Sequence, residues 1–303
     1  MAGNWQLARR RPALQARARI VQAIRAFFMD QDFLEVETPQ RIPVNAPELH
    51  IDAVRSGAWF QHTSPELCMK RLLAAGYPRI FQICRVWREG ERGGRHLPEF
   101  TMLEWYRRDA DYLDLMNDCE VLLRTLLPAG VLTVQGAAID LIPAWERLTV
   151  ADAFSTYASL PLDQALAADR FEELLTSEVE PRLGQERPTF LYDYPVELAA
   201  LARRKAADAK LAERFELYIA GIEIANAFSE LTDPVEQRQR FNAEEGARRA
   251  QGKEPLPLPE KFLAELSNLP PCAGIALGLD RLVMLLAGAT TLDEVVAFLP
   301  EEL

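Results

Sequence analysis

The chain has 303 residues, 49% of them hydrophobic, so it is long enough to bury a large core within one domain. Its 45 acidic residues outnumber its 34 basic residues, and the net charge of -11 disfavours a large polyanion such as a nucleic acid as its partner. Because no run of about 18 apolar residues occurs and the N-terminus lacks the apolar segment of a secretory signal, we expect a cytosolic protein.

The N-terminal stretch, residues 1–28, contains six arginines and no acidic residue. Such a composition also occurs in transit peptides and nucleic-acid-binding arms. However, Leu14, Ile20, Ile24 and Phe27 have helical spacing, and the pattern runs directly into the rest of the domain. We therefore expect a helix of the domain, followed by a short strand that ends at Pro39 because proline cannot continue a ladder.

A second helix is expected to begin at the segment Thr63-Ser64-Pro65-Glu66. A hydroxyl residue followed by proline is typical of a capped helix start, and the apolar residues Leu67, Met69 and Leu73 continue with helical spacing. By itself this segment indicates only a helix N-terminus.

The stretch 79–109 predicts a β-hairpin with an unusually charged loop. Ile80–Arg88 is rich in strand-forming residues, and in the second strand Phe100, Met102, Glu104 and Tyr106 share one face. The loop between them combines three glycines with arginine, glutamate and histidine, more charge than a turn requires. An ordinary solvated turn and a functional loop are both compatible with this pattern.

The residues after the hairpin predict further helices. Asp111–Leu127 has helical apolar spacing, residues 143–188 contain weak helical patterns with a Thr149 cap, and Asp233 begins a polar helix that runs toward Gly252. The proline-rich residues 254–259 form a stiff connector.

A second group of buried acids is expected in residues 215–231, where two strands turn near Ala220-Gly221. Glu216, Glu223 and Asn226 interrupt an otherwise apolar segment, and carboxylates are seldom buried without a partner. We therefore expect a cation beside them. Ideal alternation places Glu223 on the opposite face from Asn226 and Glu230, so a bulge is needed if all three line one pocket.

Residues 274–286 predict a strand, a tight turn and a helix, with Arg281 near the helix N-terminus, where it adds a cation to amide groups that favour phosphate. The four cysteines are scattered singly and are expected to be reduced and mostly buried. The three histidines form no ligand cluster in the sequence, so we do not expect a histidine-bound metal.

Together these segments resemble the class II aminoacyl-tRNA synthetases, in particular the lysine branch. Trp87-Arg88-Glu89-Gly90 and the stretch from His96 to Tyr106 resemble motif 2, the strand before Pro39 resembles motif 1, and Gly274–Leu286 resembles motif 3. Gly90 stands where the family usually has Glu, and Leu97 replaces an Asn that touches the nucleotide. The resemblance implies an α+β fold, a mostly antiparallel six-stranded sheet flanked by helices.

The resemblance also implies the site residues. Arg88 and Arg281 would be catalytic, and Glu216 and Glu223 would hold magnesium on ATP. ATP would be bound by Arg88, Glu89, Gly90, Glu91, His96, Leu97, Phe100, Glu230, Leu231, Gly278 and Arg281. The amino acid would be bound by Ser64, Pro65, Glu66, Glu104, Tyr106, Asn226, Glu230 and Ala276.

The resemblance begins near residue 13, without the anticodon-binding OB domain of lysyl-tRNA synthetases, so we expect one catalytic domain over residues 1–303 with a variable helical insertion at about 143–188. Paralogues of that form act on elongation factor P. They imply ATP-dependent activation of (R)-β-lysine or lysine, transfer to a lysine of elongation factor P and a homodimer; tRNA is an unlikely acceptor. Acylation of tRNA or another acceptor and a non-catalytic binding module remain alternatives.

Overall fold

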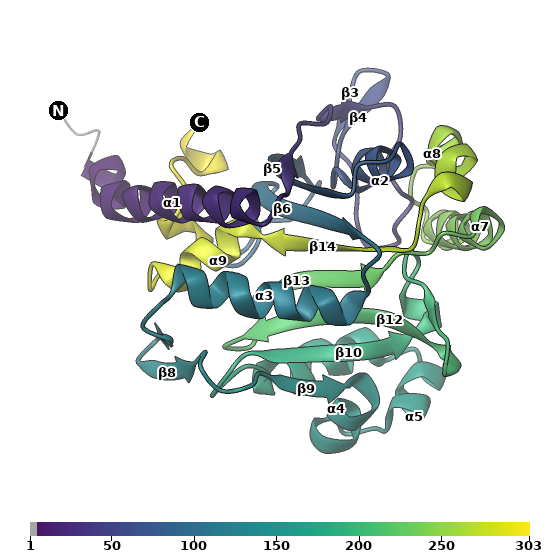
Figure 1. Cartoon of the computed structure of the whole chain (residues 1–303). Helices are drawn as coiled ribbons and strands as arrows, with labels where there is room; N and C mark the ends of the chain where they lie inside the picture. The colour runs from purple at the N-terminus through teal and green to yellow at the C-terminus, as the bar shows by residue number, and fades with distance from the viewer. Residues whose placement is uncertain (1–4) are drawn as a thin grey trace. The chain divides into compact units, whose positions relative to one another are not determined.

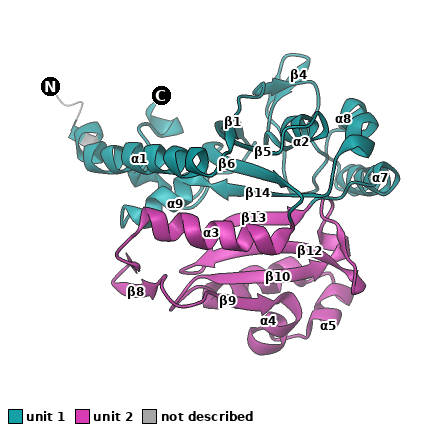
Figure 2. Cartoon of the chain, viewed as in Figure 1, with its two compact units in different colours: residues 1–110, 230–303 teal, residues 111–229 magenta. Residues whose placement is uncertain are grey.

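The computed structural model of the chain describes residues 5–303, and the first four residues of the basic N-terminal stretch lie outside this range. The described chain divides into two compact units (Figure 2). Unit 1 comprises residues up to 110 and residues 230–303, and unit 2 comprises residues 111–229. The expectation of one catalytic domain over residues 1–303 stays a prediction.

Unit 1 contains a sheet of four strands in the order β1-β5-β6-β14 (Figure 1). β5 and β14 are antiparallel to β6, whereas β1 is parallel to β5. A small sheet of order β2-β4-β3 precedes the second helix. The strands are β1 (Leu34–Glu35), β2 (Arg41–Ile42), β3 (Arg55–Ser56), β4 (Trp59–Gln61), β5 (Arg79–Trp87), β6 (Glu99–Arg108) and β14 (Cys272–Gly278).

The helices of unit 1 confirm the elements expected around the hairpin. Asp233 caps α7 by accepting hydrogen bonds from the amides of Val235 and Glu236. Strand β14 passes directly into α9, without the separate tight turn that we expected, because the extended residue Gly278 serves as the N-cap. The helices are α1 (Trp5–Asp30), α2 (Glu66–Ala74), α7 (Pro234–Ala250), α8 (Glu260–Glu265) and α9 (Leu279–Leu286), with 3-10 turns at Leu266–Asn268, Leu292–Glu294 and Pro300–Glu302.

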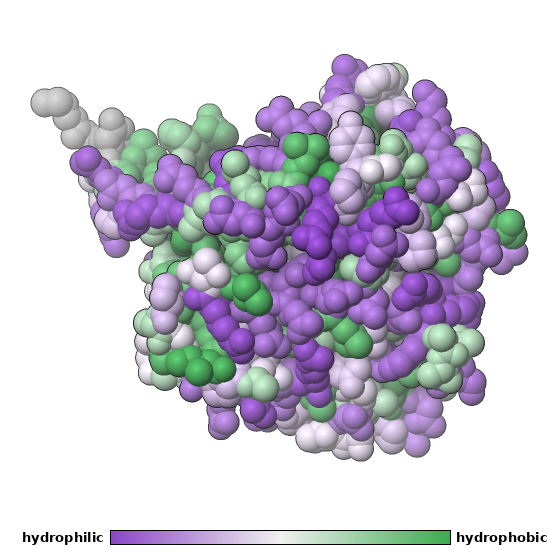
Figure 3. All heavy atoms as spheres, in the orientation of Figure 1, coloured by the Kyte–Doolittle hydropathy of each residue, from purple (hydrophilic) through white to green (hydrophobic). Residues whose placement is uncertain are grey.

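The core of unit 1 joins α1 to the hairpin. The ring of Phe28 stacks on Phe81 with centroids 4.8 Å apart and also contacts Phe33 and Trp105. Burying aromatic side chains of this size contributes strongly to stability. The N-terminal arginine-rich segment is therefore an integral helix of the fold, and its exposed side chains are mainly hydrophilic (Figure 3).

Unit 2 contains a sheet of order β13-β12-β10-β9, with β11 paired to β12, and a separate β7-β8 hairpin. Its helices in the expected insertion pack on β10 and β12 through Phe154, Phe171, Leu191 and Tyr218. The elements are α3 (Tyr112–Leu126), β7 (Val131–Val134), β8 (Ala137–Asp140), β9 (Glu146–Thr149), α4 (Val150–Tyr157), α5 (Leu162–Ala167), α6 (Phe171–Leu174), a π-helical turn (Leu175–Val179), 3-10 turns (Glu180–Arg182, Val196–Leu198), β10 (Thr189–Pro195), β11 (Arg204–Lys205), β12 (Asp208–Ile219) and β13 (Ile222–Ser229).

The α+β class with mostly antiparallel strands is confirmed. The expected number of six strands corresponds to the longest ones, β5, β6 and β14 in unit 1 and β10, β12 and β13 in unit 2. Short edge strands such as β1 and β11 raise the number above six. Within residues 5–303, no helix has the length and apolar character needed to cross a membrane.

The four cysteines are free, three of them are buried and Cys68 is half-buried.

Candidate active site

The hairpin places one row of side chains on a single face of the unit 1 sheet. Cross-strand pairs join Gln82 to Glu104 and Cys84 to Met102, and on the other side of β6 Ala276 pairs with Glu104. Directly paired residues point to the same face of a sheet. Gln82, Cys84, Met102, Glu104 and Ala276 therefore share one surface. Cys84, Val86 and Met102 form the apolar part of this surface, with Phe100 and Ala276 packed against them.

The start of α2 contributes polar groups to Glu104. The Ser64 hydroxyl accepts a hydrogen bond from the Glu66 amide at 2.9 Å and donates to Glu104 Oε1 at 2.6 Å. The N-cap of α2 is Pro65, which has no side chain for a capping hydrogen bond, so the expected capping hydroxyl lies one residue earlier. The Tyr106 hydroxyl donates to Glu104 Oε2 at 2.8 Å. Both oxygens of this buried carboxylate are therefore held in a fixed orientation.

A buried lysine lies among the carboxylates of this site. The Lys70 side chain is 1% exposed, and its ammonium pairs with Glu66 at 2.5 Å and with Glu230 Oε2. Oε1 of Glu230 has no hydrogen-bond donor among the described residues. We name Glu66, Lys70, Glu104 and Glu230 the carboxylate pocket.

Burial dominates the electrostatics of the carboxylate pocket. Burial raises the pKa of Glu104 to about 8, the charge of Glu66 adds to this effect, and the Ser64 and Tyr106 hydroxyls oppose it. Burial likewise raises the pKa of Glu230 to about 8, against the attraction of Lys70. Burial alone would lower the pKa of Lys70, but the charges of Glu230 and Glu66 outweigh it and raise that pKa. The pocket therefore contains one cation, the Lys70 ammonium, and three carboxyl groups.

Gly274 allows the pocket to close. A Cβ at this position would lie 2.2 Å from the Tyr106 ring and 2.4 Å from Glu230 Oε1. Both distances are shorter than any real carbon contact, so the two side chains can occupy their places only because residue 274 is glycine.

Two arginines contact the hairpin loop. The guanidinium of Arg88 lies 5.2 Å from the centre of the Phe100 ring, and its buried Nε has no acceptor among the described residues. Arg281, in the first turn of α9, donates to the Arg95 carbonyl at 3.2 Å and to His96 Nε2 at 2.7 Å. Because Nε2 accepts this bond, it carries no proton. Both arginines are placed to bind an anionic group beside the loop.

The loop explains the unusual Gly90. Gly90 adopts φ of 77°, where a residue with a side chain is strained, and nothing lies within 4 Å of a Cβ built there. The carboxylate beside Arg88 belongs instead to Glu91, at 3.7 Å, whereas Glu89 is exposed. Leu97 is only 3% exposed, so little of its side chain is available to a nucleotide.

Within unit 2, the turn between β12 and β13 lies at Ala220 and Gly221, as expected, and both residues have positive φ. The pairing shifts by one residue, since Tyr218 pairs with Glu223 while Glu216 pairs with Asn226. This bulge brings Glu223 to the same face as Glu216 and Asn226. The sequence called for such an irregularity on the condition that Glu223, Asn226 and Glu230 line one pocket, and that grouping stays a prediction.

The cation beside this face is Arg214. It donates to Glu216 at 2.5 Å and to the Asn226 side-chain oxygen at 3.0 Å, and the hydroxyls of Tyr194 and Tyr218 each donate to Glu216 at 2.6 Å. Burial raises the pKa of Glu216, Arg214 opposes the rise and Glu223 adds to it. No group of three or more metal-ligating acids, histidines or cysteines occurs among residues 5–303. Mg²⁺ bound together with phosphate oxygens needs only one or two carboxylates, not an all-protein cage. Both oxygens of Glu216 already accept hydrogen bonds, so Glu216 would reach Mg²⁺ only if Arg214 or the two tyrosines released it.

Comparison with known proteins places the fold in a family. The model of tRNA synthetases class II (D, K and N) matches residues 5–302. The chain belongs to the class II tRNA synthetases. Among its relatives are the elongation factor P–(R)-beta-lysine ligases of Salmonella typhi, 41% identical, and of Salmonella gallinarum (strain 287/91 / NCTC 13346), 42% identical. Each comparison covers 97% of this chain and 97% of the relative.

In this class II synthetase the residues predicted for the amino acid fall into both units. Ser64, Pro65, Glu66, Glu104, Tyr106, Glu230 and Ala276 belong to unit 1, whereas Asn226 belongs to unit 2. Leu231, predicted to contact ATP, is 4% exposed, and Gly278 is the N-cap of α9. The roles of these residues stay predictions.

Sequence reasoning missed three residues that contact predicted site residues within their own unit. Lys70 follows Glu66 by four residues, a spacing typical of helix ion pairs, which are usually solvated. Arg214 precedes Glu216 by two residues and therefore shares its strand face. Nothing in the sequence distinguishes Gly274 from other glycines, because its neighbours Tyr106 and Glu230 are distant in the chain.

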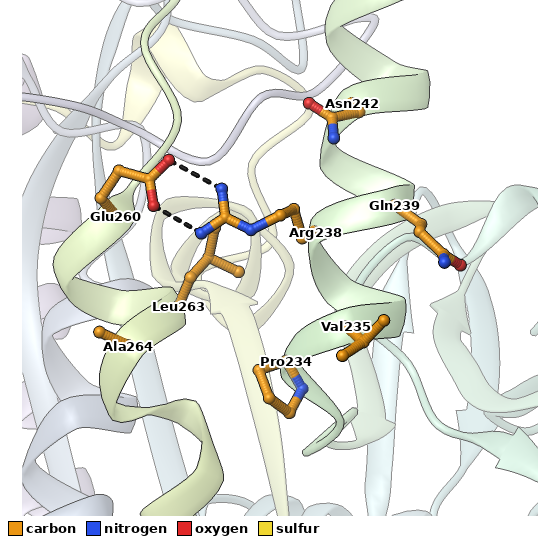
Figure 4. A pocket seen from close by; sticks show the side chains of 8 residues that line it. All are labelled: Pro234, Val235, Arg238, Gln239, Asn242, Glu260, Leu263 and Ala264. Atoms are coloured by element: carbon orange, nitrogen blue, oxygen red, sulfur yellow. Dashed lines mark hydrogen bonds and ion pairs between the residues drawn. The ribbon is translucent and has the colours of Figure 1, made fainter.

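A shallow groove between α7 and α8 lies apart from these residues. Figure 4 shows Arg238 paired with Glu260 across it, and the remaining lining includes Val235 and Leu263. None of its lining residues was predicted for the synthetase site, so the groove is not assigned to catalysis.

Proposed function

We propose that this chain is an ATP-dependent ligase that activates (R)-β-lysine as an acyl-adenylate and transfers it to a lysine of elongation factor P. The similarity to ligases of that name over 97% of both chains supports the reaction. The observation that carries the substrate class is the carboxylate pocket, because Glu104 and Glu230 are buried, Glu66 is half-buried, and among residues 5–303 the cation paired with these acids is Lys70. Buried ammonium groups require such carboxylate partners.

In the first step, a carboxylate oxygen of the amino acid attacks the α-phosphorus of ATP, and the bond from that phosphorus to the pyrophosphate oxygen breaks. Arg88 and Arg281 would stabilise the charge that develops on the phosphate, as fixed donors do in other active sites. Glu216 and Glu223 would hold Mg²⁺, which would offset charge on the leaving pyrophosphate. Glu66, Glu104 and Glu230 would orient the ammonium groups.

In the second step, an unprotonated lysine amine of the acceptor attacks the acyl carbonyl carbon. An amide bond forms, AMP leaves with the electrons of the broken bond, and the new amide nitrogen loses a proton. Ala276 shares the strand face of Glu104, so its methyl group would shape the part of the pocket that distinguishes β- from α-amino acids. ATP and a translation factor as substrates support a cytoplasmic location.

The protein acceptor leads to the first prediction. Labelled (R)-β-lysine with ATP is expected to appear on elongation factor P and not on bulk tRNA, because binding tRNA requires many phosphate contacts. The basic residues that could contact phosphates are largely paired within the protein. Arg203 pairs with Glu213 and Lys205 with Asp193 in unit 2. In α1, Arg10, Arg17 and Arg25 pair with Glu302, Asp280 and Glu35. The two acceptors are offered in parallel to the purified enzyme.

Omission of ATP is the control in this assay. Label on tRNA with none on elongation factor P would contradict the proposed protein acceptor and indicate an enzyme that acylates tRNA. A failure of pyrophosphate exchange with every lysine isomer would favour the non-catalytic alternative.

We also propose a homodimer that uses the edge of the unit 1 sheet. β1 pairs only with β5 in that sheet, so its other edge is open, and Met29 and Leu34 beside it are 62% and 51% exposed. An open edge with exposed apolar side chains is suited to association. Light scattering after gel filtration is expected to give twice the chain mass of 34.2 kDa, and a mass of one chain at micromolar concentration would refute the dimer.

A further inference from the structure

The carboxylate pocket contains an unusual internal cation. Lys70 is 1% exposed, whereas lysine is almost never fully buried in proteins unless it is paired. It lies in α2 one turn after Glu66, and its ammonium also meets Glu230, 160 positions later in the chain. One nitrogen therefore links the start of α2 to the segment that precedes α7.

The closest approach of Lys70 to each partner is to a single carboxylate oxygen. Glu66 uses Oε1, and Glu230 uses Oε2, which leaves Oε1 of Glu230 without a donor among the described residues. That free oxygen lies on the side of Gly274 and Tyr106. Lys70 thus holds the two carboxylates from one side, while Glu230 Oε1 packs against Gly274 and Tyr106.

Counting charges within the carboxylate pocket gives three carboxylates and one ammonium. The other titratable groups in contact are neutral, because burial raises the pKa of Tyr106 far above its usual value and that of Cys84 to about 12. With all acids ionised, the described pocket carries a net charge of -2. Burial raises the pKa of Glu104 and of Glu230 to about 8, so their ionisation near neutral pH requires an additional cation in the pocket.

We propose that Lys70 is a positioning residue that sets the number of ammonium groups the pocket accepts at two. This inference rests on the proposed function, since the two ammonium groups of a diamino acid supply the missing charge while its carboxylate remains outside the count. Without Lys70, three ammonium groups from a ligand would be needed to balance the three carboxylates. With Lys70 a monoamine leaves one carboxylate uncompensated, and a buried charge without a partner is costly.

The pH dependence follows from the same count. An ammonium ligand stabilises the ionised carboxylates, so below pH 8 binding must release protons from Glu104 and Glu230. Affinity for a diammonium ligand is therefore expected to rise as the pH increases toward about 8 and to level off above it. Removal of Lys70 should shift this rise to higher pH, since Glu230 and Glu66 lose their fixed cation.

The test uses binding, so that it does not depend on adenylation. The affinities of 1,5-diaminopentane and n-pentylamine for the full-length protein are measured by calorimetry between pH 6.5 and 9. The wild type is expected to prefer the diamine by about ten-fold or more, as for a charge-assisted hydrogen bond. In Lys70→Met the diamine affinity at pH 7.5 should fall by about ten-fold or more, and the midpoint of its rise should increase by about one pH unit.

Two further variants separate charge from packing. Arg71→Met removes a cation from the same helix, but Arg71 pairs with Glu265 outside the pocket, so the diamine midpoint should not change. The double variant Lys70→Met/Glu66→Gln removes one cation and one anion. It leaves two carboxylates and no ammonium, so the net charge with all acids ionised is again -2. Its midpoint should return to within about half a unit of the wild-type value.

Either of two results would overturn the proposal. One is a Lys70→Met protein with the wild-type midpoint. The other is a double variant whose midpoint stays as high as that of Lys70→Met, which would mean that Lys70 acts through packing. If the wild type prefers the diamine but exchanges no pyrophosphate with any lysine isomer, the proposed ligase function fails while the role of Lys70 stands.

Discussion

Replacement of Arg281 by alanine is expected to lower the rate of adenylate formation by about 10²-fold or more, the loss typical of a preorganised donor at a developing charge. Arg281 lies in the first turn of α9 and contacts the Arg95 carbonyl and His96 in the loop of the hairpin. The amide groups of a helix N-terminus already favour an anion there. The guanidinium therefore adds charge where phosphate is expected to bind.

The measurement is ATP–pyrophosphate exchange at saturating lysine, together with a thermal melting curve. Arg238→Ala is the matched control, because Arg238 is also a helix arginine with a carboxylate partner, Glu260, but lies outside the predicted site. Arg281→Ala should melt within a few degrees of the wild type. Full exchange activity in this variant would show that the phosphates are held by other groups.

Replacement of Gly274 by alanine is expected to lower kcat/KM for the amino acid by about 10²-fold, because a displacement of about 1 Å in an active site can have an effect of that size. The new Cβ would lie 2.2 Å from the Tyr106 ring and 2.4 Å from Glu230 Oε1. Neither side chain can yield easily, since the Tyr106 hydroxyl is bonded to Glu104 and Glu230 is paired with Lys70. Tyr106 or Glu230 must move, and the carboxylate pocket changes shape.

The KM for ATP should change less than the KM for the amino acid, because of the residues predicted to bind ATP only Glu230 contacts Gly274, whereas the contacts described for Arg88 and Arg281 do not involve it. Overpacking of this kind costs about 1–3 kcal/mol of stability, so the melting curve is recorded alongside. Gly246→Ala is the control, since nothing lies within 4 Å of a Cβ there and alanine favours a helix interior. An unchanged KM for the amino acid in Gly274→Ala would contradict the tight packing described here.

Local sequence patterns predicted much of the fold because local interactions determine those elements. The hairpin strands, the helix after Asp111, the Asp233 cap and the turn at Ala220-Gly221 all depend on residues within a few positions of one another. The bulge in β13 was expected only on the condition that Glu223, Asn226 and Glu230 line one pocket, since regular alternation would place Glu223 on the opposite face. The direct junction of β14 with α9 was not, because it depends on the single conformation of Gly278.

The sequence by itself determined that the chain carries a set of acids in apolar segments and the motifs of a class II synthetase, and from these motifs it predicted two phosphate-binding arginines. Only the tertiary structure decided which acids share a pocket and which cation lies among them. The sequence pattern around Lys70 is typical of a solvent-exposed helix lysine, and nothing in the sequence distinguishes Gly274 from other strand glycines. Their roles depend on Glu230 and Tyr106, and burial and close contact between distant segments arise only when the chain is folded.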